Sequence, residues 1–233
     1  MRQFGNDLFG YAADWCFPKT CLGCGADGCL LCPHCRLNSD WRVRRICPVC
    51  HRELALGELC HKSRLENLWS LSPYEGLMIQ LIKNFKYDGV IDLADEVFRE
   101  GLEKFLILRP ALPEKSIIVP VPLHRKKFLR RGFNQSEIIA QILSNQLFRP
   151  IAADLLRRKV NNKPQARQDF ESRIRNVQGI FEVDYRHLSG YYGCRILLVD
   201  DVYTTGSTLG ECAGELAKAG FGDISAITLA FGG

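Results

Sequence analysis

The sequence of 233 residues lacks a hydrophobic run of membrane-spanning length. A transmembrane helix needs roughly 20 largely uncharged apolar residues, and no stretch of the chain approaches this. The first 15 residues, MRQFGNDLFGYAADW, carry Asp7 and have no continuous apolar block before a small-residue cleavage site, so they do not match a secretory signal. We therefore expect a soluble cytoplasmic protein with no membrane insertion.

Two common phosphate-binding motifs are also missing. The chain contains no Gly-x4-Gly-Lys-[Ser/Thr], and no Gly-x-Gly-x2-Gly follows a predicted strand. These glycine-rich loops bring backbone amides close to the phosphates of ATP or of dinucleotides. Their absence removes most of the support for an ATPase or a dinucleotide-dependent enzyme.

Cysteine is scarce beyond residue 60 and abundant before it. Nine of the eleven cysteines lie between Cys16 and Cys60, and only Cys194 and Cys212 follow. Many of the early ones form Cys-x2-Cys pairs, the spacing that presents two thiolates to one tetrahedral zinc. A disulfide framework is the alternative, but it belongs to secreted chains. The pattern favours a small N-terminal zinc ribbon, which has no open coordination position and is therefore structural.

Two zinc sites are predicted from the spacing. Cys29 forms a further Cys-x2-Cys pair with Cys32 and is a competing ligand for the first site. The second site lacks an obvious fourth ligand, because Ser63 occupies the position that would complete another Cys-x2-Cys pair; His61, His51 or another cysteine is left as the candidate. The predicted ligands are Cys21, Cys24, Cys32 and Cys35 for the first site, and Cys47, Cys50 and Cys60 for the second.

Strands and helices alternate in the rest of the chain, which predicts an α/β domain with a mostly parallel sheet flanked by helices. The polar segment 61–76 is interpreted as a linker, with the ribbon domain at 1–68 and the α/β domain at 69–233. Expected helices cover 77–82, 91–106, 134–147 and 209–219; expected strands cover 116–123, 179–183, 196–201 and 224–231.

The strand at 196–201 ends in Asp200 and Asp201 and leads into small hydroxyl residues around Gly206. Ligands of parallel sheets bind at the carboxyl ends of the strands, and a turn entering a helix presents free amides that favour an anion. Carboxylates accept hydrogen bonds from vicinal hydroxyls. A ribose 5-phosphate satisfies both requirements, whereas the alternative is an ordinary helix cap at Ser207 with two surface aspartates.

Basic residues cluster in two segments although the net charge is only +5. Five cations lie within 125–131, and the segment 157–176 is strongly basic and nearly free of apolar residues. Cations this close repel one another unless an anion is present. A solvated basic face is the alternative, but long polar loops inside compact domains are usually lids or binding loops.

The run 196–208 resembles the phosphoribosyl-pyrophosphate (PRPP) motif of type I phosphoribosyltransferases, in which four apolar residues, two acids and a Thr-Thr-Gly loop follow one another. Over nearly its full length the chain is similar to the ComF family of competence proteins. The matching pieces are the Cys-x2-Cys pairs, Tyr74, Lys86 and Tyr87, the segments VPVPLHRKKFLRRGFNQSEIIA and KPQARQDFESRIRNVQGIF, and the PRPP run. Ser63 is the visible departure and concerns only the second zinc site.

The resemblance implies a type I phosphoribosyltransferase-like fold and a role for each matching segment. Asp200 and Asp201 are the expected catalytic pair, orienting the ribose and stabilising developing positive charge, with Mg²⁺ accompanying the pyrophosphate. Residues 120–123 form the pyrophosphate loop, and the basic stretch 163–173 forms a loop that closes over the ligand. The expected PRPP-binding residues are Thr204, Thr205, Gly206, Ser207, Thr208, Pro120, Val121, Pro122, Arg131, Lys163, Gln165 and Arg173.

Two functions of different classes remain compatible with the sequence. One is a phosphoribosyltransferase, a glycosyltransferase with an unknown acceptor. The other is a non-catalytic protein that senses PRPP or binds single-stranded DNA beside the competence machinery, using the two basic segments to hold the strand during DNA uptake. A phosphate-lined site and a basic groove can share one surface, so the two functions do not exclude each other.

Overall fold

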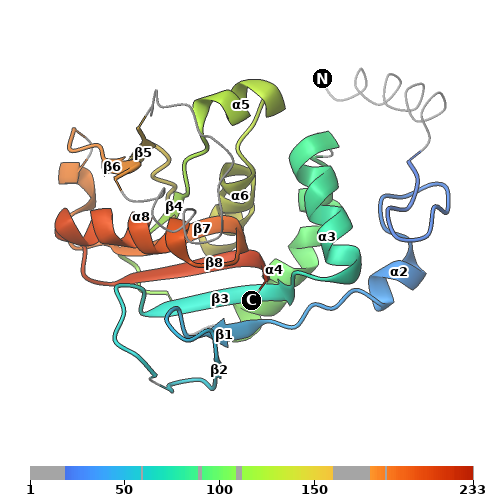
Figure 1. The fold of residues 1–233 in the computed structure, drawn as a ribbon, viewed down its shortest axis with the longest axis horizontal. Helices are drawn as coiled ribbons and strands as arrows, with labels where there is room; N and C mark the ends of the chain where they lie inside the picture. Colours follow the sequence, from blue (N-terminus) through green and yellow to red (C-terminus); the bar gives the residue numbers. More distant parts are fainter. Residues whose placement is uncertain are drawn as a thin grey trace.

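The computed structural model describes residues 19–58, 60–88, 91–108, 112–159, 179–186 and 188–232. Its centre is a six-stranded sheet with the order β2-β1-β3-β8-β7-β4 (Figure 1). Four neighbouring strands run parallel, and the β1–β2 hairpin adds antiparallel to the edge at β3. The strands are β1 Arg44–Ile46, β2 Glu53–Leu54, β3 Asn67–Pro73, β4 Ser116–Pro120, β7 Arg195–Tyr203 and β8 Ile224–Phe231. The predicted mostly parallel α/β sheet is confirmed.

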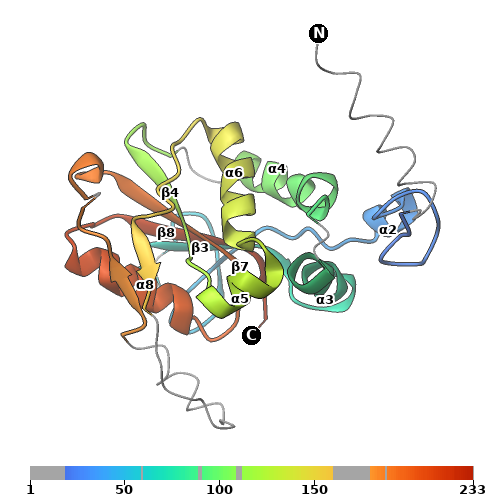
Figure 2. The ribbon, with the colours of Figure 1, turned by 90° about the horizontal axis from the view of Figure 1, so that it is seen from above.

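Helices cover both faces of this sheet (Figure 2). Residues that alternate along β7 therefore enter two different cores: Leu197 and Val199 pack toward one face, Ile196 and Leu198 toward the other. This explains why the strand is a continuous apolar run rather than an alternating one. The first face carries α3 Gly76–Lys83, α4 Arg99–Leu108 and α6 Gln135–Leu147, and the second carries α8 Ser207–Lys218.

Shorter elements complete the described part of the chain. Two π-helical segments, Asn84–Asp88 and Ala94–Phe98, follow α3 and precede α4. Helix α2 spans Pro33–Leu37, α5 spans Arg125–Arg131, and a 3-10 turn covers Leu188–Tyr191. Strands β5 Leu156–Arg158 and β6 Phe181–Val183 form a separate two-stranded sheet. No helix among the described residues is both long and apolar enough to cross a bilayer.

The segment expected to be a linker contains β3 instead, an interior strand of the sheet. Leu68 and Leu71 are fully buried, and the hydroxyls that made the segment look polar are satisfied internally: Ser70 donates to the carbonyl of Ser72 at 3.0 Å. The cysteine-rich segment also contributes β1 and β2 to the same sheet. The division at residue 68 remains a prediction about domains, but the sheet itself extends across it.

Because β3, β8, β7 and β4 are parallel, their carboxyl ends lie along one edge of the sheet. The polar residues that follow β7 and β4 are therefore neighbours in space. This edge, partly covered by α5 and by the segment after α3, is where the candidate site lies.

Candidate functional site

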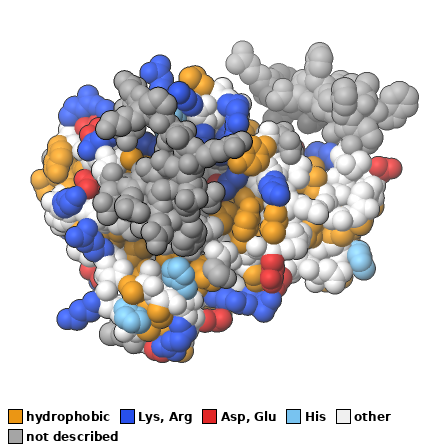
Figure 3. Space-filling view, in the orientation of Figure 1, with side chains coloured by type: hydrophobic (Ala, Val, Ile, Leu, Met, Phe, Trp, Pro, Cys, Tyr) orange, Lys and Arg blue, Asp and Glu red, His pale blue; other side chains and the backbone are white. Residues whose placement is uncertain are grey.

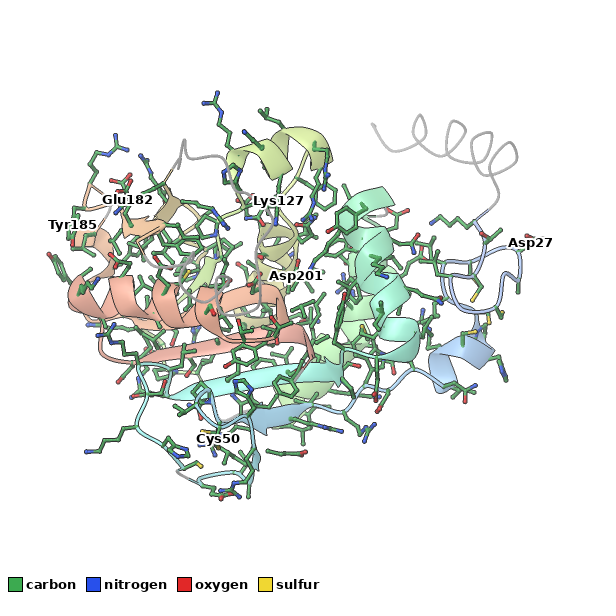
Figure 4. The ribbon with its side chains drawn as sticks, viewed as in Figure 1. Asp27, Cys50, Lys127, Glu182, Tyr185 and Asp201 are labelled. Carbon is green, nitrogen blue, oxygen red and sulfur yellow. The ribbon has the colours of Figure 1, made fainter. Side chains whose placement is uncertain are left out.

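A cleft of about 380 Å³ opens at the carboxyl ends of β7 and β4. Asp200 and Asp201 lie on its floor, and Val121 and Pro122 from the end of β4 form one wall. Lys127 of α5 also lines it; Figure 4 labels this lysine together with Asp201. The sequence expectation that the β4 loop and the acidic pair lie together therefore agrees with the geometry.

The two aspartates are held differently. The Asp201 carboxylate is largely buried and forms an ion pair with Lys86, with a distance of 2.8 Å between Nζ and Oδ1. Asp200 Oδ1 accepts hydrogen bonds from Ser136 Oγ at 3.1 Å and from the amide of Asp201 at 2.9 Å. Burial and then the charge of Asp201 raise the pKa of Asp200 to about 7. The negative charge of Asp201 is thus balanced by Lys86. Asp200, in contrast, changes its protonation state near neutral pH.

The loop after β7 forms a smaller hollow that adjoins the cleft through Asp200, Thr204 and Thr208. Gly206 adopts the left-handed conformation, with φ 74° and ψ −3°, and turns the chain into α8. The hydroxyls of Thr205 and Ser207 lie 2.9 Å apart. The amides that begin α8 consequently face a concave, hydroxyl-lined space, which is the arrangement that binds an anion.

Three further cations, Lys127, Arg131 and Arg158, line the cleft together with the acids. Arg131 donates to Gln135 Oε1 at 2.9 Å, and its guanidinium lies 4.8 Å from the centre of the Tyr87 ring. Burial lowers the pKa of Arg158, and loss of solvent followed by the charges of Arg158 and Arg131 lowers the pKa of Lys127. Within the described ranges, no carboxylate forms an ion pair with any of these three cations. Their mutual repulsion would be relieved by an anionic ligand in the cleft.

The structure gathers most of the predicted ligand-binding residues and leaves some untested. Pro120 closes β4 and is buried behind the cleft rather than lining it. The loop residues Lys163, Gln165 and Arg173 lie outside the described residues. The predicted residues that do line the cleft or its adjoining hollow are Asp200, Asp201, Thr204, Thr205, Gly206, Ser207, Thr208, Val121, Pro122 and Arg131.

Sequence reasoning included Arg158 in the basic segment 157–176 and gave it no individual role, whereas the structure places it in a strand and in the lining of the cleft. It sits in β5, where Leu156 is buried and Arg157 is exposed, and its guanidinium lies 5.3 Å from the centre of the Phe181 ring. The alternation Leu-Arg-Arg is a weak strand signal. Only the pairing of β5 with β6 shows that the second arginine turns inward, so a sequence pattern alone could not have singled it out.

Four cysteines form the first metal cluster, as predicted. Their Sγ atoms all lie within 4.8 Å of one another, and those of Cys24 and Cys32 are 3.6 Å apart. A zinc site with metal–sulfur bonds of about 2.3 Å places its sulfurs about 3.8 Å apart, so the donor set fits this metal. Burial opposes ionisation of Cys21, but the backbone amides of Cys32, Cys24 and Gly23 lower its pKa to about 6. Cys29 lies outside the set; the ligands are Cys21, Cys24, Cys32 and Cys35.

The second cluster is completed by a histidine. His61 Nδ1 lies 3.1 Å from Cys60 Sγ and 3.5 Å from Cys47 Sγ, while Cys50 and Cys60 are 3.5 Å apart. Three thiolates and one imidazole are a common structural zinc set. His61 is thus the candidate among the three that the sequence left open, and His51 instead packs on Tyr203 at 5.5 Å between ring centres.

All ten cysteines in the described part of the chain are free thiols, which argues against the disulfide alternative for them. The two clusters lie in different places. The first surrounds α2, beyond α3, whereas the second sits on the β1–β2 hairpin at the edge of the sheet, where Figure 4 labels Cys50. Both have four protein ligands and no open position, so they stabilise structure rather than supply a reactive metal.

Comparison with known proteins gives consistent similarities over most of the chain. The DNA utilization protein YhgH of Escherichia coli (strain K12) is 31% identical over 198 residues, covering 82% of this chain and 79% of that protein. Competence protein F of Haemophilus influenzae is 28% identical over 225 residues, covering 85% and 96%. Competence protein ComFC of Bacillus subtilis is 25% identical over 213 residues, covering 85% and 83%. No family model matches the chain.

Proposed function

Because the chain belongs to the ComF family of competence and DNA utilization proteins, we propose that it binds PRPP in the cleft at the carboxyl ends of β7 and β4. One observation carries this proposal. The acidic pair, the hydroxyl loop at the start of α8 and a set of cations with no carboxylate partner among the described residues surround one cleft and the hollow that adjoins it. These three groups match the ribose hydroxyls, the 5-phosphate and the pyrophosphate of one molecule.

Each part of the ligand has a complementary part of the site. The 5-phosphate accepts hydrogen bonds from the amides and hydroxyls of 204–208. The ribose hydroxyls donate to Asp200 and Asp201, whose side chains are already oriented by Ser136 and Lys86. The pyrophosphate lies toward Lys127, Arg131 and Arg158. Mg²⁺ supplies further charge neutralisation when it arrives bound to the pyrophosphate, and we assign no side chain as its ligand.

The same arrangement suits transfer of the phosphoribosyl group. Breaking the bond between C1 of the ribose and the pyrophosphate leaves positive charge on the sugar and a multiply charged leaving group. The acidic pair stabilises the first, the cations stabilise the second, and the rigid loop holds the 5-phosphate so that the ribose is correctly oriented. The acceptor forms its bond to C1 as the bond to the pyrophosphate breaks, the pyrophosphate leaves as an anion, and the proton of the acceptor passes to water.

A second function, binding of single-stranded DNA, is favoured by α5. This helix has no buried residue, and five of its seven residues are Lys or Arg. Phe128 is 42% and Leu129 is 73% exposed, so apolar side chains stand among the cations. Figure 3 shows Lys and Arg side chains along the upper edge of the molecule, where α5 lies in Figure 1. Phosphate contacts with nearby apolar surfaces are typical of proteins that hold a single strand, and relatives are named for competence and DNA utilization.

Calorimetry with PRPP and Mg²⁺ tests the binding proposal. We expect Asp200→Asn combined with Asp201→Asn to abolish binding while the protein remains folded, because the neutral amides no longer match the ribose hydroxyls and the Lys86 charge. Asp95→Asn, an exposed position in the segment Ala94–Phe98 that does not line the cleft, is the matched control and should bind normally. Unchanged affinity in the double variant would contradict the ribose assignment. Pyrophosphate release with bases, amines and oligonucleotides as acceptors then separates an enzyme from a sensor.

A further inference from the structure

Tyr203 contacts both the second metal cluster and the loop 204–208, which is called the phosphate-binding loop because the proposed function places the 5-phosphate there. It is the last residue of β7 and is only 2% exposed. Its hydroxyl donates to the carbonyl of Pro48 at 3.1 Å, and Pro48 lies between the metal ligands Cys47 and Cys50. Its ring lies 5.8 Å from that of Phe231 in a stacked arrangement, which leaves it little freedom to move away.

The same hydroxyl also contacts the loop, at Gly206. Gly206 approaches Tyr203 so closely that a Cβ at this position would lie 2.2 Å from the tyrosine Oη. Tyr203 also lines the hollow at the start of α8 together with Thr204, Thr205 and Ser207. The turn between the two metal ligands and the turn that faces the anion therefore contact one phenol group from opposite sides.

Besides the packing of the His51 ring on Tyr203 and Phe231, the metal turn makes few contacts among the described residues. Val49 at its tip is 53% exposed, Cys50 is exposed, and the adjoining strand β2 is two residues long. His51 adopts a positive φ of 62°, which is unfavourable for a residue other than glycine. Hydrogen bonds from the amides of Cys47 and His51 close the turn at 2.8 and 2.9 Å. Four metal bonds would fix this turn far more strongly than these contacts alone.

We propose that the second metal cluster acts, through Tyr203, as a rigid support for the phosphate-binding loop, so that Tyr203 is a positioning residue for the anion. The metal fixes the Pro48 carbonyl, the carbonyl fixes the tyrosine hydroxyl, and the hydroxyl limits where Gly206 and its neighbours lie. By reciprocity, an anion bound in the loop also stabilises the metal site. The identity of that anion as PRPP rests on the proposed function; the coupling between metal and loop does not.

Hydrogen exchange of the loop amides tests this coupling without any ligand. Tyr203→Phe retains the ring and both metals but loses the contacts of the hydroxyl with the Pro48 carbonyl at 3.1 Å and with His51 Nε2 at 3.4 Å, both in the metal turn. His61→Ala loses the second metal.

Loop exchange is read at the Gly210 amide, which donates to the Gly206 carbonyl at 2.8 Å and so is protected only while the loop holds its place. We expect its exchange to increase about fivefold in Tyr203→Phe, the effect of losing one typical hydrogen bond, and at least as much in His61→Ala. Exchange of the core strand β4 should not change.

Two variants serve as matched controls. Tyr192→Phe removes an exposed phenol hydroxyl, and Cys24→Ser removes a ligand of the first cluster; neither should affect the loop. Loop exchange that stays at the wild-type rate in Tyr203→Phe, with both zinc ions retained, would overturn the proposal. The proposal would also be overturned if Tyr203→Phe increased exchange in β4 as much as in the loop, or if Cys24→Ser increased loop exchange as much as His61→Ala does.

Calorimetry with PRPP and Mg²⁺ on the same proteins separates this inference from the proposed function. Affinity that falls about fivefold in Tyr203→Phe but not in Tyr192→Phe supports both. A wild-type protein that fails to bind PRPP, yet whose loop exchange responds to Tyr203→Phe and His61→Ala, supports the coupling and refutes PRPP as the ligand. If the wild type binds PRPP but loop exchange does not respond to Tyr203→Phe or His61→Ala, PRPP is supported as the ligand and the coupling is refuted.

Discussion

At the scale of single residues, the buried carboxyl of Asp200 lowers the stability of the fold at neutral pH, although the proposed function requires it. In the proposed function Asp200 accepts hydrogen bonds from ribose hydroxyls, and the ionised carboxylate is the better acceptor. The fold places it beside Asp201 and away from solvent, which raises its pKa to about 7. Its ordinary value in an unfolded chain is about 3.9. The folded protein therefore retains, between these two values, a proton that the unfolded chain has released.

This difference predicts a pH-dependent gain of stability in Asp200→Asn. Where the unfolded chain binds fewer protons, the free energy of unfolding falls as pH rises; for Asp200 this fall lies between about pH 4 and pH 7 and is complete above it. Asparagine cannot ionise and still accepts from Ser136 Oγ. We expect the variant to be more stable than the wild type by roughly 2 kcal/mol at pH 8, with the difference largely gone at pH 4.5.

Urea unfolding at the two pH values measures this effect. Asp95→Asn, an exposed position that pairs with Arg99, is the control for the loss of an ordinary surface carboxylate. A difference between Asp200→Asn and wild type that is equal at pH 4.5 and pH 8 would contradict the assignment of the raised pKa to Asp200.

Residue-scale prediction from sequence succeeded where local spacing carries the chemistry. Two Cys-x2-Cys pairs place four sulfurs around one point whatever surrounds them, and Asp200 and Asp201 follow directly from a buried strand. His61 and Arg158 depend on contacts that no local pattern encodes. His61 reaches Cys47 only because the chain returns to the hairpin, and Arg158 reaches the cleft only because β5 pairs with β6. Because Ser63 stands where a fourth cysteine was expected, the sequence made the second site look incomplete, although His61 completes it.

At the scale of elements, the β7–α8 connection was predictable and β3 was not. An apolar run that ends in acids and then in Thr-Thr-Gly marks both a strand end and a helix start, and the helix begins at Ser207. Strand β3 lies in the segment 61–76, whose polar composition suggested a linker although serine alternates with apolar residues at 69–72, the pattern of a strand. Its serines are buried because each hydroxyl donates to a carbonyl of its own segment, a form of compensation that composition does not show.

The loop in this connection predicts a specific effect of Gly206→Ala. The left-handed conformation costs about 1 kcal/mol with a side chain present, and the new methyl group would collide with the Tyr203 hydroxyl. The loop must shift, so we expect PRPP affinity in calorimetry to fall at least tenfold and thermal stability to decrease. Gly210→Ala is the matched control in the same helix, since no atom lies within 4 Å of its added Cβ. It should bind normally and be slightly more stable.

Gly206→Ala also distinguishes the support role of Tyr203 from simple packing. Combining it with Tyr203→Ala removes the atoms that the methyl group meets. Partial recovery of loop protection in the double variant relative to Gly206→Ala alone would show that the collision, and not only the backbone conformation, displaces the loop. Identical losses in both proteins would assign the whole effect to backbone strain.

At the scale of the whole molecule, the two metal clusters contact different parts of the α/β core (Figure 1). The first is docked on the helices: Lys19 pairs with Glu96 at 2.7 Å, and Arg36 donates to the Glu96 carbonyl at 2.6 Å. Trp41 packs so closely on Gly101 that a Cβ there would lie 2.5 Å from its ring. The second cluster extends the sheet. Neither cluster region has a large core of its own, so metal binding contributes directly to its folding free energy.

Protein purified without chelators is accordingly expected to contain two zinc ions per chain, one for each four-ligand cluster. Cys24→Ser and His61→Ala should each retain one ion, whereas Cys29→Ser should retain both because Cys29 lies outside the first set. Cobalt substitution identifies which ion is lost, since a four-thiolate site and a site with three thiolates and one imidazole differ in their absorption spectra. Loss of an ion in Cys29→Ser would mean that this cysteine is a ligand in solution. Absence of zinc from the wild type, together with oxidised cysteines in mass spectrometry, would replace both metal sites by disulfides and remove the basis for a metal-supported loop.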